Sequence, residues 1–282
     1  MQFTGSATFQ KPALVMLLTA LALPRPMLAD ESFYLLYRHW QSYDWPDNTA
    51  PAEPVSREQR AAGWRRGFTS GDIGVDYDYQ PLRIRTGDPA HNGHLHRVTL
   101  GGQWRRHLYH LEARAGLAGT SNMFKDQNLH GDIVNGRLAL FRALNDASPF
   151  HLGVGGDHRF GSFRWLPRVR WQQTGPSGQW LMDFPVSVSW RSPSPEWTIS
   201  LERNGDRWAT LDQDARVESA LYLQEWRAEL TYRISAARHW QPGLVVGIGV
   251  SMGTRVAYRD LATGTVDMTL GDAMFGSVRV RW

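Results

Sequence analysis

The last residues of the chain alternate apolar and polar side chains in a pattern that few folds accommodate. One parity carries the apolar side chains of Met274, Val278, Val280 and Trp282. The other parity carries the polar side chains of Ser277, Arg279 and Arg281. Successive side chains of a strand point to opposite faces, and a strand between lipid and a polar lumen needs this alternation. The ending therefore predicts a transmembrane β-strand.

The first residues of the chain indicate export. The apolar run Ala13–Leu23 follows Lys11 and is shorter than the ~20 residues with which a helix crosses a bilayer. With the small residue Ala29, this run predicts a signal peptide over residues 1–29, and the large Met27 leaves the cleavage position open. The chain has no cysteine, so backbone ladders and a packed interior must hold the exported protein together.

Several other segments also alternate with a period of two. The clearest are Gly71–Tyr79, Leu108–Leu117, Gln179–Arg191, Val217–Ile234 and Leu244–Met252. Tryptophan lies near both ends of Gln179–Arg191, as expected for aromatic girdles at two membrane interfaces. A soluble β-sandwich also alternates, but its core face rarely carries so many Trp and Tyr side chains. The pattern favours an all-β fold, a transmembrane antiparallel up-and-down β-barrel.

The lengths of the connections predict the strand number. Taking Trp282 as periplasmic, we expect short turns at Arg105–His107, Asn145–Ser148, Ser192–Pro195 and Ser235–Arg238. We expect external connections at Pro81–Gly93, Gly119–Gly131, Thr174–Gly178, Asn204–Arg216 and Arg259–Leu270. This rhythm gives about 10 strands over residues 70–282, with both termini periplasmic. The count treats Phe150–Gln173 as one traverse, although a split at Phe160–Ser162 is an alternative. A barrel of 12 strands that also uses Phe33–Tyr43 is another.

The segment over residues 30–69 does not resemble the rest of the barrel. Asp47–Pro54 is polar and rich in proline, which is typical of a linker. Ser56–Arg66 predicts a short helix, because Ser56 and Gln59 have the spacing of a capping box. We therefore expect a periplasmic segment or a plug in the lumen, followed by the barrel over residues 70–282.

The charged residues indicate a polar lumen. Lys11 and Lys125 are the only lysines among the 31 basic residues, and arginine pairs bidentately with carboxylates. A GC-rich genome is an alternative reason for the arginine bias. The side chains predicted to line the lumen are Asp72, Asp76, Asp78, Glu112, Arg114, Arg164, Arg168, Arg170, Asp183, Glu225, Arg227, Glu229, Arg279 and Arg281.

Two arrangements of these lumen charges are possible. If the first strand is Gly71–Tyr79, barrel closure sets its three aspartates beside Arg279 and Arg281, in an ion-pair ladder along the seam. Alternatively, water in the lumen hydrates the same charges.

The sequence offers little catalytic chemistry. His94 and His96 share one strand face and supply two metal ligands, but no third ligand is evident. A surface hydrolase would use loop residues such as His91, Asp206 and Asp212, yet no serine–histidine or Gly-x-Ser-x-Gly motif accompanies them. We therefore predict no catalytic residues, metal site or cofactor. The net charge of +4 includes no basic run that indicates nucleic-acid binding.

The second half of the chain resembles an uncharacterised family of Gram-negative outer-membrane β-barrel proteins. Four motifs carry the resemblance: Phe163–Trp171, Asp183–Trp190, Asn204–Trp208 and the aromatic-ended last strand. The resemblance implies fold and location only, because the family has no assigned activity or catalytic residues.

Three functions are compatible with these observations. A barrel of this size is narrow, which favours a structural barrel or a narrow, porin-like channel for a small solute. The alternatives are a surface enzyme that hydrolyses lipid or peptide, and an envelope binding or assembly partner that uses residues 30–67. The expected partners are outer-membrane lipid and, through the C-terminal strand, the barrel-assembly machinery.

Overall fold

The computed structural model describes residues 31–43, 55–83, 93–125, 133–160, 163–194, 196–211, 218–235, 242–260 and 264–282. The strands are β1 (Glu31–Trp40), β2 (Ser56–Phe68), β3 (Gly71–Arg83), β4 (Gly93–Arg106), β5 (Tyr109–Thr120), β6 (Val134–Ala143), β7 (Phe150–Asp157), β8 (Arg164–Gly175), β9 (Gly178–Phe184), β10 (Ser187–Arg191), β11 (Trp197–Leu211), β12 (Glu218–Ser235), β13 (Gly243–Asp260), β14 (Gly264–Thr269) and β15 (Ala273–Arg281). A short helix, α2 (Ser121–Lys125), follows β5. No helix of the described part is long and apolar enough to span a membrane. The predicted signal peptide lies outside the described residues.

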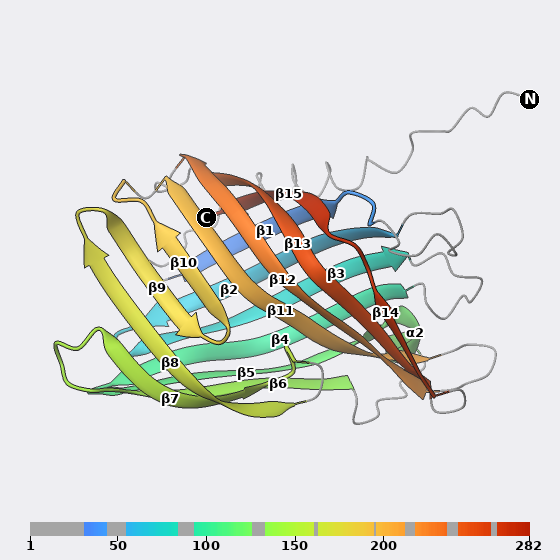
Figure 1. Cartoon of the computed structure of the whole chain (residues 1–282), viewed down its shortest axis with the longest axis horizontal. Helices are drawn as coiled ribbons and strands as arrows, with labels where there is room; N and C mark the ends of the chain where they lie inside the picture. The colour runs from blue at the N-terminus through green and yellow to red at the C-terminus, as the bar shows by residue number, and fades with distance from the viewer. Residues whose placement is uncertain are drawn as a thin grey trace, which may run out of the picture.

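The strands form one closed antiparallel barrel (Figure 1). Both β14 and β15 pair with β13, one after the other, so they are two parts of a single traverse. β1 closes the ring against β15, with Tyr34 opposite Arg281 and Trp40 opposite Phe275. Counting β14 and β15 together, the barrel has 14 strands. The prediction of an antiparallel barrel is confirmed, whereas the predicted 10 or 12 strands were too few.

Two of the missing strands lie in the segment that was predicted to be outside the barrel. β1 and β2 belong to the wall, so the predicted boundary at residue 70 is wrong. The predicted helix at Ser56–Arg66 is instead part of β2. In this strand Arg57 and Gln59 are buried while Trp64 and Phe68 are exposed, and this period of two decides the conformation. The alternative with 12 strands correctly used Phe33–Tyr43 as a strand, since β1 covers most of it, although its strand number was too low.

The other two missing strands come from predicted traverses that fold back. Phe150–Gln173 splits into β7, which ends at Asp157, and β8, which begins at Arg164, so the alternative split is right. Gln179–Arg191 is the hairpin of β9 and β10, which turns at Pro185 and sets Trp180 opposite Trp190. Opposed residues of a hairpin share a face, so its alternation looks like that of one straight strand.

Two of the predicted loops are also largely strand. β11 continues to Leu211 and β13 to Asp260, and β14 begins at Gly264. Long strands therefore replace most of the predicted connections Asn204–Arg216 and Arg259–Leu270.

The two ends of the barrel differ. At one end, called the termini end, β1 begins, β15 ends, and short turns follow Phe68, Arg106 and Arg191 (Figure 1, left). At the other end, called the far end, α2 follows β5. The predicted turns near residues 105–107, 145–148 and 192–195 share the termini end, as expected. The turn at Thr174–Gly178 also lies there, contrary to prediction, because the β9–β10 hairpin reverses the chain twice. The periplasmic position of the termini stays a prediction.

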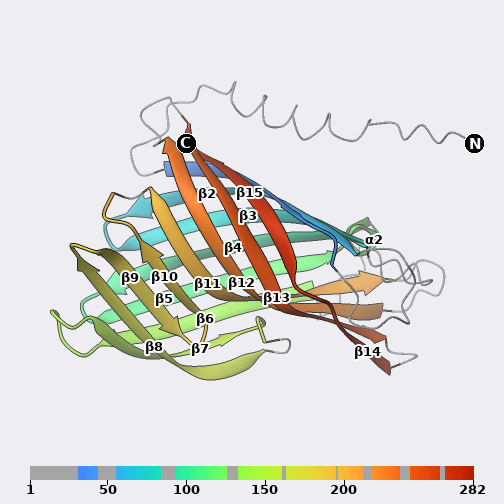
Figure 2. The ribbon, with the colours of Figure 1, turned by 45° about the horizontal axis from the view of Figure 1, so that its top comes forward.

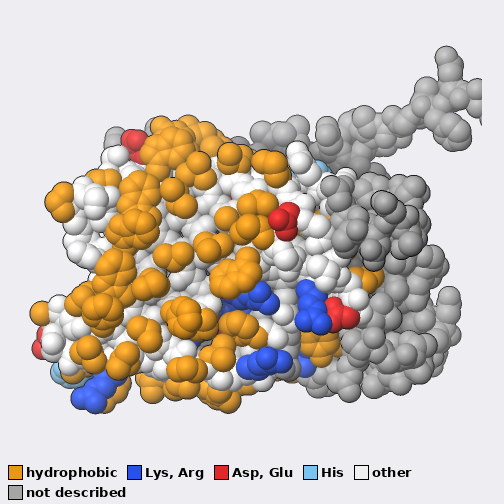
Figure 3. Space-filling view, in the orientation of Figure 1, with side chains coloured by type: hydrophobic (Ala, Val, Ile, Leu, Met, Phe, Trp, Pro, Cys, Tyr) orange, Lys and Arg blue, Asp and Glu red, His pale blue; other side chains and the backbone are white. Residues whose placement is uncertain are grey.

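The outer surface of the barrel is strongly apolar (Figure 3). Its exposed apolar side chains include Val75, Val98, Leu100, Leu138, Leu140, Leu152, Val154, Ile199, Ile248, Met274 and Val278. Exposed aromatic side chains gather near the termini end, at Phe68, Tyr109, Phe150, Trp180 and Trp197. An apolar band with an aromatic girdle matches the lipid-facing surface of a transmembrane barrel.

The barrel narrows toward the far end. β10 pairs with β11 only from Thr198 to Glu202, so the rest of β11 lacks that neighbour (Figures 1 and 2). This free part leans across the lumen and forms a parallel bridge to β5, with Ala209 opposite Gly119. The Asn135 amide donates to the Arg207 carbonyl over 2.7 Å, which gives the free edge a new partner. Between this contact and the far end, the ring consists of nine strands: β1–β5, β11–β13 and the β14–β15 traverse.

Replacing Leu138 by arginine tests which face meets lipid. Leu138 is 40% exposed on the outer face of β6. The variant should lose about 2–4 kcal/mol of unfolding free energy if arginine meets the lipid midplane. Urea unfolding in phospholipid vesicles, followed by tryptophan fluorescence, measures the loss. The control Ser200→Arg, on the inner face of β11, should lose clearly less, and equal losses would contradict the assignment of faces.

Candidate functional site

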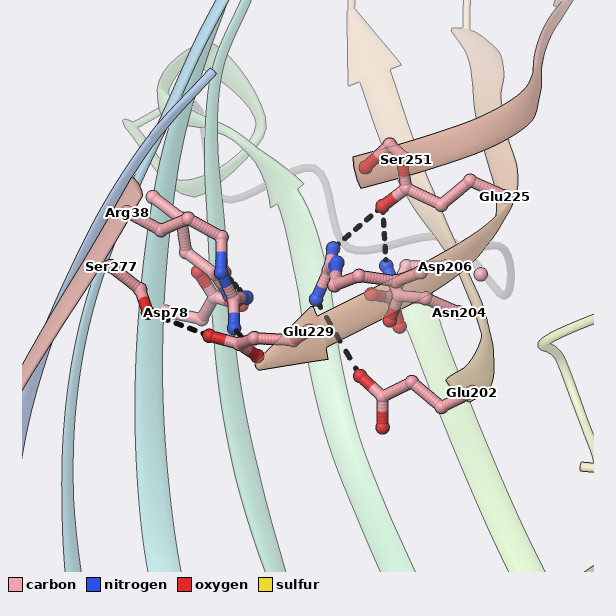
Figure 4. Close-up of polar contacts among 12 residues, drawn as sticks. Arg38, Asp78, Glu202, Asn204, Asp206, Glu225, Glu229, Ser251 and Ser277 are labelled. Carbon is pink, nitrogen blue, oxygen red and sulfur yellow. Dashed lines mark hydrogen bonds and ion pairs between the residues drawn. The ribbon is translucent and has the colours of Figure 1, made fainter. Parts of the chain in front are cut away.

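Ion pairs join strands that are not neighbours in the wall, so they cross the interior. Arg57 of β2 donates to both carboxylate oxygens of Glu225 of β12, over 3.0 and 2.9 Å. Arg227 and Asn204 also donate to Glu225, and its side chain is 0% exposed. A buried charge is tolerable only when it is paired and hydrogen-bonded in this way. We call these four residues, together with the Arg38–Glu229 pair, the central cluster (Figure 4).

Arg38 connects the central cluster to the barrel seam. It donates to Glu229 over 2.9 Å and to Gln59 over 2.8 Å. The Ser277 hydroxyl of β15 donates to the same Glu229 carboxylate over 2.6 Å. The inner faces of β1, β12 and β15 are therefore tied together at this level (Figure 4).

A second set of ion pairs holds the barrel closed where β11 crosses it. Arg97 of β4 pairs with Asp206 of β11, and Arg137 of β6 donates to the same carboxylate over 3.1 Å. Six strands separate β4 from β11 in either direction around the ring, so this contact joins opposite walls. Arg97 also donates to Asp78 over 2.5 Å. We call Arg97, Arg137 and Asp206, with the Ala209–Gly119 bridge, the waist.

Apolar side chains fill the interior between the waist and the far end. The fully buried members include Trp40, Tyr43, Val55, Leu82, Leu95, Trp208 and Leu223. Trp40 also packs under the central cluster, with the Arg57 guanidinium 4.2 Å from the ring centroid.

A polar cavity of about 150 Å³ lies on the termini side of the waist. Its lining includes Asp76, Arg97, Arg114, Asn135 and Asp206. The Tyr34 hydroxyl donates to Asp76 over 2.6 Å, and Arg65 lies 3.6 Å from the same carboxylate. The waist thus forms the floor of a charged chamber that is large enough for several waters or a small solute.

A third cluster lies on the wider side of the barrel. Asp183 accepts hydrogen bonds from Arg168 over 2.8 Å and from Arg170 over 2.7 Å. Arg170 also donates to Glu112 over 2.7 Å and contacts the His110 Nδ1 atom at 2.8 Å. These contacts tie β5, β8 and β9 together at the level where the β9–β10 hairpin ends.

The structure groups the predicted lumen residues differently from the sequence. Glu225, Arg227 and Glu229 lie in the central cluster, and Asp183, Arg168, Arg170 and Glu112 in the third cluster. Asp78 reaches the waist through Arg97, and Asp76 and Arg114 line the cavity. Arg164 lies opposite Asp157 in the β7–β8 ladder.

The predicted seam ladder is wrong. β3, which carries Asp72, Asp76 and Asp78, is separated from β15 by β1 and β2. Arg279 and Arg281 therefore face Leu36 and Tyr34 of β1, while Asp72 pairs with Arg65 of β2 at 3.4 Å. The error follows from the missing first two strands.

The structure describes some of the residues that were considered for metal binding and hydrolysis. His94 and His96 share one face, as predicted; the His94 ring stacks on Tyr79, and the His96 ring packs against Tyr79 at a tilt. Their Nδ1 atoms contact the hydroxyls of Tyr79 and Tyr77, and the described residues hold no cluster of three metal-ligating side chains. Asp206 is tied up in the waist, contrary to its predicted place in a loop. His91 and Asp212 lie outside the described residues.

Sequence reasoning missed Arg38, Arg57, Arg97 and Arg137, and it assigned Asp206 to a loop. The first two lie in the segment that was assigned outside the barrel. Arg97 and Arg137 follow the inward parity of their strands, so the period of two could have identified them. No sequence signal reveals that Asp206 meets the opposite wall, because that contact depends on the short β9–β10 hairpin.

Comparisons with known proteins give similar solved structures but no sequence match. No family model matches the chain, and no curated protein sequence does. Among solved structures, a bacterial polysaccharide outer-membrane secretin is similar, with 11% identity, a TM-score of 0.39, and coverage of 91% of this chain and 99% of that one. An outer-membrane channel from Pseudomonas putida F1 has 8% identity, a TM-score of 0.43, and coverage of 90% and 96%. The outer membrane protein opdK from Pseudomonas aeruginosa has 8% identity, a TM-score of 0.32, and coverage of 91% and 100%.

Removing one partner of the Arg57–Glu225 pair should strongly destabilise the barrel. Arg57→Met leaves a buried carboxylate with less compensation, and a loss of about 3–5 kcal/mol is expected. The double variant Arg57→Met/Glu225→Leu should recover part of this loss, because no isolated charge then stays buried. Urea unfolding of the single and double variants measures the loss of unfolding free energy and its partial recovery.

The Arg60→Ala variant is a matched control for this experiment. Arg60 pairs with Glu58 on the surface at 2.9 Å, so its loss should stay below about 1 kcal/mol. A loss for Arg57→Met as small as that of the control would show that the central pair does not hold the barrel.

Proposed function

We propose that the protein is an outer-membrane β-barrel of the channel type, whose lumen is closed at the waist in the state described. Three features support a membrane location: a closed sheet, an apolar outer band and an aromatic girdle. The predicted signal peptide is consistent with this location. The termini would then lie in the periplasm, where barrel proteins have their short turns.

The single observation that carries the channel proposal is the charged chamber on the termini side of the waist. A wall of 14 strands encloses more space than its own side chains fill, whereas eight strands enclose just enough. On the termini side, the excess space is polar and includes the cavity of about 150 Å³. Arg97, Asp206 and Arg137 separate this chamber from the apolar layer. Separating these three side chains would extend the chamber toward the far end.

A permanently closed structural barrel is the second candidate. The largely buried central cluster and the apolar layer favour it, because both link strands that are not neighbours in the wall. The two functions differ in one measurable property, the conductance of the barrel.

The other two functions considered from the sequence are less favoured, because residues that they require have other roles in the barrel. The assembly partner would use residues 30–67, but β1 and β2 are strands of the wall. The surface hydrolase would use Asp206, which is buried between two arginines.

Opening the waist should increase conductance. In planar bilayers, the wild-type barrel should show small or rare current steps. The Arg97→Ala/Asp206→Ala variant should show larger and more frequent steps, because it removes the ion pair between opposite walls. Current recorded at fixed voltage measures the effect, and heat-modifiable electrophoretic migration checks that both barrels are folded.

The pair Arg255 and Asp267 offers a matched control, since it lies on the exposed surface of β13 and β14. Alanine at both positions should leave the current unchanged. Silent bilayers for both the wild type and the waist variant would exclude the channel and favour the structural barrel.

A further inference from the structure

The carboxylates of the interior all have arginine partners. Among the described residues, these carboxylates are Asp72, Asp76, Asp78, Glu112, Asp157, Asp183, Glu202, Asp206, Glu225 and Glu229. Arginines outnumber them on the same inner faces, so some positive charge is left without a carboxylate.

Six inward arginines form no ion pair within the described part of the chain. They are Arg105, Arg114, Arg191, Arg233, Arg279 and Arg281. Their inward direction follows from the parity of paired neighbours, such as Arg227 and Glu229 before Arg233 and Ser277 before Arg279.

These arginines are concentrated at one mouth of the barrel. All of them except Arg114 lie within two residues of a strand end at the termini end: Arg105 in β4, Arg191 in β10, Arg233 in β12, and Arg279 and Arg281 in β15. Arg233 is half-buried and the rest of the six are exposed. Charges without partners are costly away from water, so this mouth must be wet or occupied by anions.

The spacing of three of these arginines fits an anion with several charges. Arg279 and Arg281 are two residues apart on one face of β15, which separates their backbones by about 7 Å. Arg233 and Arg279 both lie opposite Val245 of β13, which sets their strands about 10 Å apart. Their long, flexible side chains can converge on a small ligand between them.

We propose that the termini-side mouth is a binding vestibule for small anions with two or more negative charges, such as phosphorylated or polycarboxylated solutes. The proposal rests on the proposed function only in taking this mouth as open to water. The positive potential of the vestibule concentrates anions above the chamber. The paired charges of the central cluster and the waist contribute little to that potential, because their partners neutralise them.

Calorimetric titration with inorganic tripolyphosphate tests this proposal on the folded barrel in an uncharged detergent at low ionic strength. The wild type should bind the probe, and binding should weaken as salt screens the arginines. Arg279→Gln/Arg281→Gln should bind about tenfold more weakly, since two of the five arginine charges at this mouth are lost.

Arg142→Gln provides the matched control. Arg142 lies near the same end on the outer side, 5.9 Å from the Tyr109 ring, so its loss should leave the affinity unchanged. Equal affinities for the wild type, the double variant and the control would overturn the proposal, as would the absence of binding to the wild type. Binding by a barrel that never conducts would support the vestibule while excluding the channel. Conductance without binding would support the channel while excluding the vestibule.

Discussion

Charge pairing across the lumen is the interaction on which the rest of this structure depends. A barrel has no second layer to cover its inner face, so each charge there must find water or an opposite charge across the bore. Arginine suits this role, because its guanidinium carries several donors. Arg57 donates from Nη1 to both oxygens of Glu225 and from Nε and Nη2 to Gln80. The resulting contacts join β1, β2 and β4 to β11 and β12, and they set how far the walls approach each other.

The short β9–β10 hairpin explains why the barrel closes where it does. Beyond Glu202, β11 loses its neighbour on that side, and a strand edge in a lipid environment must find new partners for its backbone. It finds them on β5 and β6, through the Ala209–Gly119 bridge and the Asn135 amide. A Cβ atom at Gly119 would lie only 3.2 Å from the Ala209 carbonyl oxygen, so glycine allows this approach. A wide barrel at the termini end thus becomes a narrow neck at the far end.

The distribution of charge follows the same asymmetry. Near the waist, every carboxylate that the structure describes is paired with arginine, and the layer beyond is apolar. Near the termini end, where the ring has all its strands and more room, arginines such as Arg279 and Arg281 stand without carboxylates. The dielectric environment accounts for both: unpaired charge is tolerated where water reaches it and excluded where it does not.

The sequence by itself determined which face of each strand is apolar, because that property is local and has a period of two. It therefore predicted an antiparallel barrel and the inward direction of side chains such as Asp183 and Glu225. It did not determine the strand number, since a hairpin that sets Trp180 opposite Trp190 keeps the parity of a straight strand. Only the tertiary structure decided which charges pair, because closure and the waist bring together strands far apart in the chain. The meeting of Arg97 and Asp206 depends on that closure, and no local pattern records it.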